Sequence, residues 1–414
     1  MAPLLPLHLL KLLCVGLWWW PLLCLAAIPT NISRGDGAGS IYGPASGDDD
    51  RSAEGEGGSG RHIRAALQSR KVANVTISPV SPYNETGVVS RSSPREPLAR
   101  YGEGIVYMLE LAIGTPGQVV SAILDTGSYT LLLDPTCDRA ADPTACRTYG
   151  YYDTSQSSTA QSLDGWFAGK FGTGYMQGVW YSDTAYVGMD NLPLPSLRVG
   201  VSKLSEYVWA GVLGVSYGNA WNTGYKTLLD LLVAQGYIEV PIFSLGVGYQ
   251  GGGSPRITPP GQNETVLTES KFERNVLIDS GSTYTYLSAD MVAAIAKALY
   301  AYLDPHGVWI VPCESRNLDG SVNFGFNFYN IVIRVNYADF IVDFDSYCAL
   351  GVQITDDKDS TWVLGTSFIR AAYLVFDQQN DAVWIAQYFP CGESVTDLTT
   401  DAGRQLWLEV TGLC

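Results

Sequence analysis

The sequence predicts a mainly β protein built from two related β-lobes. Two observations support this prediction: the composition, and a pattern that occurs twice. Among 414 residues there are 44 glycines and 25 tyrosines, and aromatic residues reach 12%. Such residues favour turns and strands over long helices. With 46% hydrophobic residues, the chain is able to bury a sizeable core.

The repeated pattern is an apolar run that leads into Asp, then Thr or Ser, then Gly and Ser. It occurs at residues 122–128 (AILDTGS) and again at residues 276–282 (VLIDSGS). A second shared element, Val-Leu-Gly, begins 87 residues after Asp125 and 84 residues after Asp279. Two elements repeated in the same order at nearly the same spacing indicate two homologous lobes related by a pseudo-twofold axis.

This arrangement predicts that Asp125 and Asp279 form a catalytic pair. Two carboxylates about 3 Å apart cannot both ionise easily, so the pair holds one proton over a wide acidic range. The ionised carboxylate can take a proton from a bound water while the protonated one donates to a carbonyl oxygen. This chemistry hydrolyses an amide without a covalent intermediate. The alternative interpretation is that both are ordinary turn aspartates.

Six neighbouring residues are predicted to support the pair: Thr126, Gly127, Ser128, Ser280, Gly281 and Ser282. The glycines allow the backbone to turn tightly and approach the opposite lobe. The hydroxyls of Thr126 and Ser280 are expected to bond to the backbone of the other lobe. Those of Ser128 and Ser282 are expected to donate to the aspartates and hold their orientation.

The first 100 residues differ from the rest. Residues 1–27 combine one lysine with an apolar run closed by small residues, which is typical of a secretory signal peptide; an uncleaved membrane anchor is the alternative. Residues 28–100 contain few large apolar side chains and are predicted to be a propeptide, or else a disordered linker. Residues 1–100 carry a net charge of +2, from 10 basic and 8 acidic residues. The pair Arg70-Lys71 and the single Arg100 are both candidate maturation sites.

The rest of the chain is strongly acidic, and this excludes several classes of function. Residues 101–414 carry 15 basic and 33 acidic residues, a net charge of −18. A surface of this sign repels phosphate backbones, so no nucleic-acid partner is expected. Of three histidines only His306 lies in the domain, where an exposed turn is expected. Mechanisms that need histidine are therefore excluded, and neither a metal site nor another cofactor is predicted.

In a secreted chain, cysteines can form disulfides and Asn-x-Ser/Thr sequons can be glycosylated. Six cysteines remain after the signal peptide, and an even number in a secreted chain suggests disulfides, with 15 possible connectivities. Four Asn-x-Ser/Thr sequons are candidates for glycosylation: Asn31, Asn74, Asn84 and Asn263. The C-terminus has no apolar tail, so a lipid anchor is not expected. Helices with a packing role are expected over residues 228–236 and 291–302.

Taken together, residues 101–390 resemble a pepsin-family aspartic protease, most closely the fungal secreted and yapsin-like members. The resemblance rests on both Asp motifs, on residues 107–116 (YMLELAIGTP), on residues 241–245 (PIFSL) and on residues 362–370 (WVLGTSFIR). It implies a bilobal pepsin-like fold with an N-terminal lobe at 101–250, a C-terminal lobe at 251–390 and a tail at 391–414. It also implies disulfides Cys137–Cys146 and Cys313–Cys348, which would leave Cys391 to pair with Cys414.

The resemblance places a substrate-covering hairpin, the flap, at five residues: Phe171, Gly172, Thr173, Gly174 and Tyr175. Two features depart from the family. Where the family has a flap tyrosine the chain has Phe171, and where the family has a tryptophan seven residues after the first aspartate it has Leu132. In the family these two side chains share a hydrogen bond. Their joint absence strands no buried polar atom, so we expect altered specificity and not loss of the catalytic pair.

The sequence therefore predicts a secreted aspartic endopeptidase, extracellular or in the cell wall, made as a zymogen and active on polypeptides in acid. Its own propeptide and pepstatin-like inhibitors are the expected binding partners, and the mature protein is expected to be a monomer. The main alternative is a catalytically inactive peptide- or wall-binding protein on the same fold. A structural surface glycoprotein held by its uncleaved N-terminus is a third interpretation.

Overall fold

The structure is a computed structural model. It describes residues 71–77, 81–82, 99–101, 106–134, 136–140, 142–171, 174–187, 192–217, 224–248, 265–268, 272, 274–326, 331–344, 346–355 and 362–389. The predicted signal peptide, most of the predicted propeptide and the tail lie outside these residues. So do Asn31, Asn84, Asn263, Gly172, Thr173, Cys391 and Cys414.

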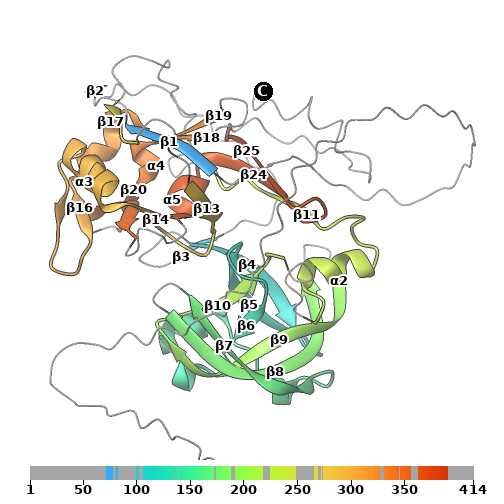
Figure 1. Ribbon diagram of the computed structural model, residues 1–414. Helices are drawn as coiled ribbons and strands as arrows, with labels where there is room; N and C mark the ends of the chain where they lie inside the picture. The colour runs from blue at the N-terminus through green and yellow to red at the C-terminus, as the bar shows by residue number, and fades with distance from the viewer. Residues whose placement is uncertain are drawn as a thin grey trace, which may run out of the picture. The chain divides into compact units, whose positions relative to one another are not determined.

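The first lobe is an eight-stranded sheet in the order β3-β4-β5-β10-β6-β9-β8-β7 (Figure 1). Its strands are β3 (Ala99–Tyr101), β4 (Val106–Ile113), β5 (Gln118–Asp125), β6 (Leu131–Leu133), β7 (Gln161–Phe171), β8 (Gly174–Val187), β9 (Leu192–Glu206) and β10 (Gly211–Gly214). Buried and less buried residues alternate along both ends of β8. This is the period of a strand with one face on a core. Leu133, Leu194 and Val199 are among the buried side chains of that core.

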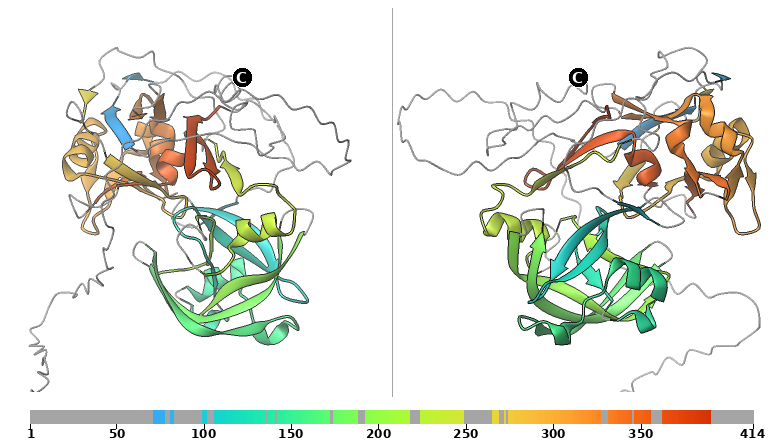
Figure 2. Two further views of the ribbon diagram at one scale, coloured as in Figure 1. Left: turned by 45° about the vertical axis from the view of Figure 1, so that its right-hand side comes forward. Right: turned by 180° about the vertical axis from the view of Figure 1, so that it is seen from behind.

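The second lobe contains another eight-stranded sheet, in the order β19-β18-β1-β13-β23-β14-β22, with β12 paired to β1. Its strands are β1 (Lys71–Ile77), β12 (Thr265–Val266), β13 (Arg274–Ile278), β14 (Thr285–Leu287), β18 (Ser321–Phe326), β19 (Ile331–Asn336), β22 (Val352–Ile354) and β23 (Trp362–Leu364). The blue strand β1 lies within this sheet in both figures that show the whole chain (Figures 1 and 2). A strand from the predicted propeptide is thus part of the second lobe.

Three smaller sheets complete the strands. Their members are β11 (Ile242–Leu245), β24 (Ala372–Asp377) and β25 (Ala382–Gln387); β15 (Tyr302–Leu303), β16 (Trp309–Val311), β20 (Ile341–Asp343) and β21 (Cys348–Leu350); and β2 (Ser81–Pro82) with β17 (Leu318–Asp319). Strand β11 follows the strands of the first lobe in the sequence, but it pairs with β24, which follows the strands of the second lobe. Phe243 and Phe376 stack across this pair, with ring centroids 4.7 Å apart. This sheet therefore joins the two halves of the sequence.

Both predicted helices are present. They are α2 (Leu228–Ala234) and α3 (Ala289–Ala298), and shorter helices occur at α1 (Pro143–Tyr149), α4 (Tyr337–Phe340) and α5 (Thr366–Ile369). Thr227 and Asp230 form a capping box at the start of α2, and Gly236 follows its end with a φ of 74°. Helix α3 begins after Ser288 and ends earlier than predicted. In the part of the chain that the structure describes, no helix is long and apolar enough to cross a membrane.

Two of the predicted disulfides are present, Cys137–Cys146 and Cys313–Cys348. The first closes a loop of the first lobe beside α1, and the second ties a 3-10 helix (Cys313–Asn317) to β21. His306 lies in an exposed turn as predicted, where its backbone N–H donates to Asp304. The backbone of Asn74 lies in β1.

The core should dominate stability. Leu374 in β24 is fully buried in the large core of the second lobe, whereas Leu303 in β15 is 51% exposed. We expect Leu374→Ala to lower the free energy of unfolding by about 3 kcal/mol, because it removes buried methyl groups and leaves a cavity. The matched variant Leu303→Ala should change it by less than about 1 kcal/mol. Urea unfolding followed by fluorescence measures both. Equal losses would contradict the assignment of the core.

Candidate active site

Each predicted catalytic aspartate stands at the end of a strand in the middle of its lobe. Asp125 ends β5, which runs parallel to β10, with Gly214 opposite Asp125. Asp279 follows β13, which runs parallel to β23, and its N–H donates to the carbonyl oxygen of Leu364 at 3.0 Å. The Val-Leu-Gly element of each repeat thus lies beside the Asp strand of the same lobe. The repeated sequence pattern therefore has the same local structure in both lobes.

The glycine of each Val-Leu-Gly element is needed for close approach. A Cβ atom at Gly214 would lie 2.3 Å from the backbone nitrogen of Thr130. A Cβ atom at Gly365 would lie 2.2 Å from the carbonyl oxygen of Tyr284. Both contacts are with the backbone of the loop that carries the aspartate. Any other residue would push this loop away from the strand.

The two Asp-Thr/Ser-Gly turns bring the carboxyl groups together. A Cβ atom at Gly127 would lie 2.8 Å from Oδ1 of Asp279, and one at Gly281 would lie 2.7 Å from Oδ1 of Asp125. Each glycine therefore faces the carboxyl group of the opposite lobe. Asp125 is buried, with 6% of its surface exposed. Burial raises the pKa of Asp279, and so do the charge of Asp125 and a hydrogen bond with it.

A reciprocal set of hydrogen bonds joins the lobes beneath this pair. The Thr126 hydroxyl donates to the carbonyl oxygen of Ile278 at 2.8 Å and accepts from the N–H of Ser280 at 2.9 Å. The Ser280 hydroxyl donates to the carbonyl oxygen of Leu124 at 2.6 Å and accepts from the N–H of Thr126 at 3.1 Å. Both side chains are buried. The predicted bonds across the axis are confirmed.

The two supporting serines differ from each other. The Ser128 hydroxyl donates to Oδ2 of Asp125 at 2.5 Å, as predicted. The expectation for Ser282 is wrong, because its hydroxyl donates to the carbonyl oxygen of Tyr284 at 3.4 Å. Asp279 instead accepts the N–H of Gly281 at 2.9 Å and a backbone hydrogen bond from Ser282. The supporting contacts are therefore richer in side-chain donors at Asp125 than at Asp279.

The predicted flap corresponds to the antiparallel hairpin of β7 and β8, in which Phe171 pairs with Gly174. Phe171 is half-buried against an apolar cluster that contains Leu132, Phe167 and Val212. A Cβ atom at Gly169 would lie 3.0 Å from the Phe171 ring and 3.7 Å from Leu132. The two positions that depart from the family thus belong to one apolar cluster. The hydroxyl of Tyr175 bonds to Gln177 at 2.9 Å, on the same strand.

One cluster beside the site was not predicted from the sequence. The guanidinium of Arg198 lies 4.2 Å from the centre of the Trp180 ring and 4.5 Å from that of Tyr225. The Tyr225 hydroxyl bonds to the Thr130 hydroxyl at 2.7 Å, in the loop that follows Asp125. Cation–π contacts of this kind stabilise a partly buried arginine. No spacing in the sequence signals this cluster, because its members come from four separate segments.

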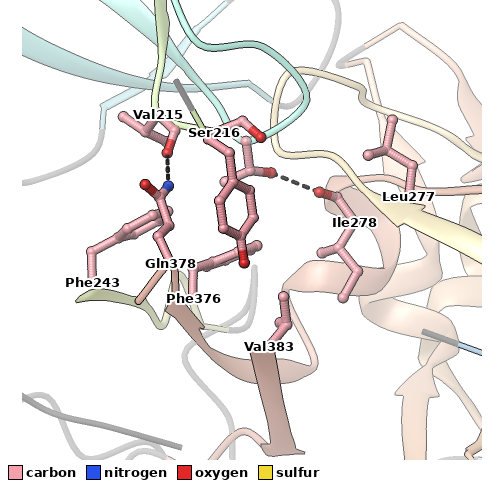
Figure 3. Close-up of a pocket in the computed structure, with 10 residues that line it drawn as sticks. Val215, Ser216, Phe243, Leu277, Ile278, Phe376, Gln378 and Val383 are labelled. Atoms are coloured by element: carbon pink, nitrogen blue, oxygen red, sulfur yellow. Dashed lines mark hydrogen bonds between the residues drawn. The ribbon is translucent and has the colours of Figure 1, made fainter. Parts of the chain in front are cut away.

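A small pocket lies next to the hydrogen bonds that join the lobes (Figure 3). Its lining includes Thr126, Tyr217, Phe243 and Ile278. Gln378 also borders it and donates to the carbonyl oxygen of Val215 at 2.6 Å, which adds a contact between distant parts of the sequence. Among the described residues there is no group of three or more His, Cys, Asp or Glu side chains that could hold a metal ion.

The hydrogen bonds between the lobes should stabilise the whole protein. Thr126→Val keeps the shape of the side chain but removes the donor to Ile278 and the acceptor for Ser280. Since both partners are buried, we expect a loss of about 3 kcal/mol in the free energy of unfolding. The control is Thr148→Val, at an exposed position of α1, which should cost less than about 1 kcal/mol. Thermal unfolding measures both, and an unchanged melting temperature in Thr126→Val would contradict the role of these bonds.

Comparison with known proteins identifies the family to which the chain is similar. The family of eukaryotic aspartyl proteases matches residues 106–257 and 260–388. Gastricsin of Rattus norvegicus is 23% identical over 321 residues, which cover 68% of this chain and 80% of gastricsin. Candidapepsin-3 of Candida albicans is 27% identical over 332 residues, which cover 70% of this chain and 81% of candidapepsin-3.

A solved structure supports the fold. The crystal structure of an aspartic proteinase from Irpex lacteus matches with a TM-score of 0.53 at 19% identity, covering 68% of this chain and 94% of that one. At this identity the likeness concerns the fold alone, and it confirms the predicted mainly β, bilobal architecture. Because the family match extends over more than half of its length, the chain belongs to the eukaryotic aspartyl proteases and is an enzyme of the aspartic endopeptidase type.

Proposed function

We propose that this protein is a secreted endopeptidase that hydrolyses polypeptides in acid, with Asp125 and Asp279 as its catalytic residues. The observation that carries the proposal is the close approach of the two carboxyl groups, each next to the glycine of the opposite lobe. A buried pair of this kind is suited to hold a single proton. Such a pair supplies a general base and a general acid together.

In the proposed mechanism, Asp125 begins as the ionised member and Asp279 as the protonated one. The assignment follows from the raised pKa of Asp279 and from the hydroxyl and N–H donors of Ser128 and Gly127, which point at Asp125. Asp125 takes a proton from a water molecule, whose oxygen attacks the peptide carbonyl carbon. Asp279 donates its proton to the carbonyl oxygen. When the C–N bond breaks, Asp125 gives its proton to the leaving nitrogen and Asp279 takes one back from a hydroxyl of the tetrahedral intermediate. The pair returns to its starting state, and no covalent enzyme intermediate forms.

The proposed substrate is an extended polypeptide that lies between the pair and the β7–β8 hairpin. An extended chain can bond to strands through its backbone, while side-chain pockets give specificity. Residues 171–175 would cover it, with the Phe171 cluster offering an apolar wall. A pepstatin-like inhibitor should occupy the same place. The mature enzyme is proposed to act as a monomer without a cofactor.

Another carboxyl group, that of Asp134, makes the folded protein more stable in acid. Asp134 is buried, and this burial raises its pKa to about 6, although a hydrogen bond with Ser202 opposes the shift. Its folded pKa lies above the ordinary value of 3.8, so the folded state binds this proton more tightly than the unfolded state. The stability that this group contributes is therefore full at low pH and is lost as pH rises toward 6. The net charge of −18 on residues 101–414 acts in the same direction, because protonation relieves repulsion.

Secretion and maturation are part of the proposal. Residues 1–27 serve as the signal peptide, and a propeptide within residues 28–100 keeps the enzyme as a zymogen until it is removed. The relative named secreted aspartic protease 3 and the cysteine pairs support an extracellular or cell-wall location, and a fungal secreted, yapsin-like type is proposed from the sequence resemblance alone. Glycosylation is proposed at the four sequons, and Cys391 is proposed to pair with Cys414.

The catalytic proposal is tested by Asp125→Asn and Asp279→Asn. We expect each variant to lose about 10³-fold in kcat/KM, and the double variant to lose little more, because the two groups act as one unit. Activity of the wild type should fall as pH rises through the raised pKa of Asp279, since the general acid must be protonated. Burial beside Asp125 raises the pKa of Asp279 to about 8, so cleavage of a peptide library between pH 3 and 9 measures this.

The control for these variants is Asp381→Asn, at an exposed turn with a φ of 51° that asparagine tolerates, and it should keep full activity. If a folded wild type without its propeptide cleaves no peptide at any pH, the catalytic proposal is wrong. In that case, binding of a peptide without cleavage would support the alternative, an inactive peptide- or wall-binding protein.

The flap hairpin offers a second test. Phe171→Ala removes the ring that packs between the hairpin and Leu132, so we expect kcat/KM to fall about tenfold, or about 1.4 kcal/mol. Trp166 lies on the same strand with 70% of its surface exposed, and Trp166→Ala is the matched aromatic control. Steady-state kinetics with one peptide compares the two variants. Equal losses would show that Phe171 has no special part in holding the hairpin over the substrate.

A further inference from the structure

The loop that follows Asp125 is bound through its backbone to the end of β10. The N–H of Ser216 donates to the carbonyl oxygen of Ser128 at 2.8 Å. The N–H of Gly214 donates to the carbonyl oxygen of Thr130 at 3.0 Å. Because the Ser128 hydroxyl donates to Asp125, the orientation of this carboxyl group depends on the position of the loop.

In the second lobe, hydroxyl groups also hold the loop that follows the aspartate. The Thr366 hydroxyl donates to the carbonyl oxygen of Thr283 at 3.2 Å. The hydroxyls of Ser367 and Thr285 bond to each other at 2.9 Å. Thr366 directly follows the glycine of Val-Leu-Gly, but in the first lobe that position is Val215, which has no hydroxyl. The two lobes therefore differ in how the side chains around the loop can hold it.

In the first lobe, Tyr225 bonds to the loop from a separate segment. Its hydroxyl bonds to the Thr130 hydroxyl at 2.7 Å. Its ring also lies beside that of Tyr129, with centroids 6.5 Å apart. Tyr225 therefore adjoins two consecutive residues of the loop that carries Ser128.

Arg198 and Trp180 in turn fix the ring of Tyr225. The guanidinium carbon of Arg198 lies 4.5 Å from the centre of the Tyr225 ring and 4.2 Å from that of Trp180. The two rings are 6.1 Å apart. Trp180 and Arg198 lie on the paired strands β8 and β9, so the sheet supports Tyr225 through cation–π contacts.

We propose that Tyr225 is a positioning residue for catalysis, which holds the loop of Asp125 in place through Thr130 and is itself held by Arg198. The inference rests on the proposed function, because it takes Asp125 as the general base. A displaced loop would misplace the base in the transition state. Loss of the contact should therefore lower kcat and leave KM nearly unchanged.

The test is the steady-state kinetics of Tyr225→Phe, Thr130→Val and the double variant. Each single variant removes one partner of the hydrogen bond and keeps the shape of the side chain. We expect kcat to fall about tenfold in each, with KM within about twofold of the wild type. The double variant should lose no more than either single variant, because all three lack the same interaction.

The control is Tyr237→Phe, which removes a hydroxyl from another tyrosine of the first lobe. That hydroxyl donates to the carbonyl oxygen of Pro193 at 3.2 Å, at an exposed position. We expect this variant to keep the kcat of the wild type. Thermal unfolding shows that each variant is folded at the temperature of the assay.

The part played by Arg198 is tested by Arg198→Met and Arg198→Lys. Methionine keeps most of the length and loses the charge, whereas lysine keeps a cation for the two rings. We expect kcat to fall about fivefold in Arg198→Met and to lie within about twofold of the wild type in Arg198→Lys. A wild-type kcat in Arg198→Met overturns the role of this arginine.

The same measurements separate this inference from the catalytic proposal. An active wild type with an unchanged kcat in Tyr225→Phe overturns the inference and leaves the catalytic proposal standing. A double variant whose loss equals the product of the single losses also overturns it, because the two hydroxyls would then act separately. A rise in KM alone would place Tyr225 in substrate binding instead. A wild type that cleaves no peptide removes both proposals.

Discussion

Two neighbouring carboxyl groups, the buried Asp125 and the partly buried Asp279, repel each other when both are charged, and the fold must hold them together against that repulsion. The reciprocal hydrogen bonds of Thr126 and Ser280 do this, because each hydroxyl binds the backbone of the opposite lobe; three of the four bonds are buried and the fourth, to Leu124, is partly buried. In this environment the pKa of Asp279 is raised, as is expected for a pair that shares one proton. The proposed chemistry depends on that proton.

The same constraint explains the glycines. Gly127 and Gly281 each face the carboxyl group of the other lobe, and Gly214 and Gly365 each face the loop that carries the aspartate. Two glycines therefore adjoin the carboxyl groups, and two adjoin the loops that carry them. The lobes are nevertheless not identical, since Ser128 donates to Asp125 while the Ser282 hydroxyl is directed to Tyr284. This small asymmetry gives the two aspartates different surroundings, and hence different proposed roles.

Outside this symmetric centre, the features specific to this chain lie in the apolar hairpin and in the N-terminal strand. Leu132 and Phe171 stand where the family resemblance implies a hydrogen-bonded tryptophan and tyrosine, and here they belong to one apolar cluster that packs beside the hairpin. Strand β1 binds a segment from before the first lobe into the sheet of the second lobe.

The two disulfide pairings followed from the resemblance to a family, because the cysteines alone left 15 connectivities open. The sequence alone determined the repeat, the two aspartates, their glycines, the cross-lobe hydroxyls and both helices. These features are local, or occur twice, so a short motif or a spacing reveals them. Only the tertiary structure decided the partner of Ser282, the contact of Arg198 with Trp180 and Tyr225, the burial of Asp134 and the place of β1. Each of these depends on which distant segments meet. Residues 28–100 are poor in apolar side chains, so their composition does not predict a strand. A strand can nevertheless be stabilised by backbone hydrogen bonds to its neighbours, and amino-acid composition does not predict those bonds.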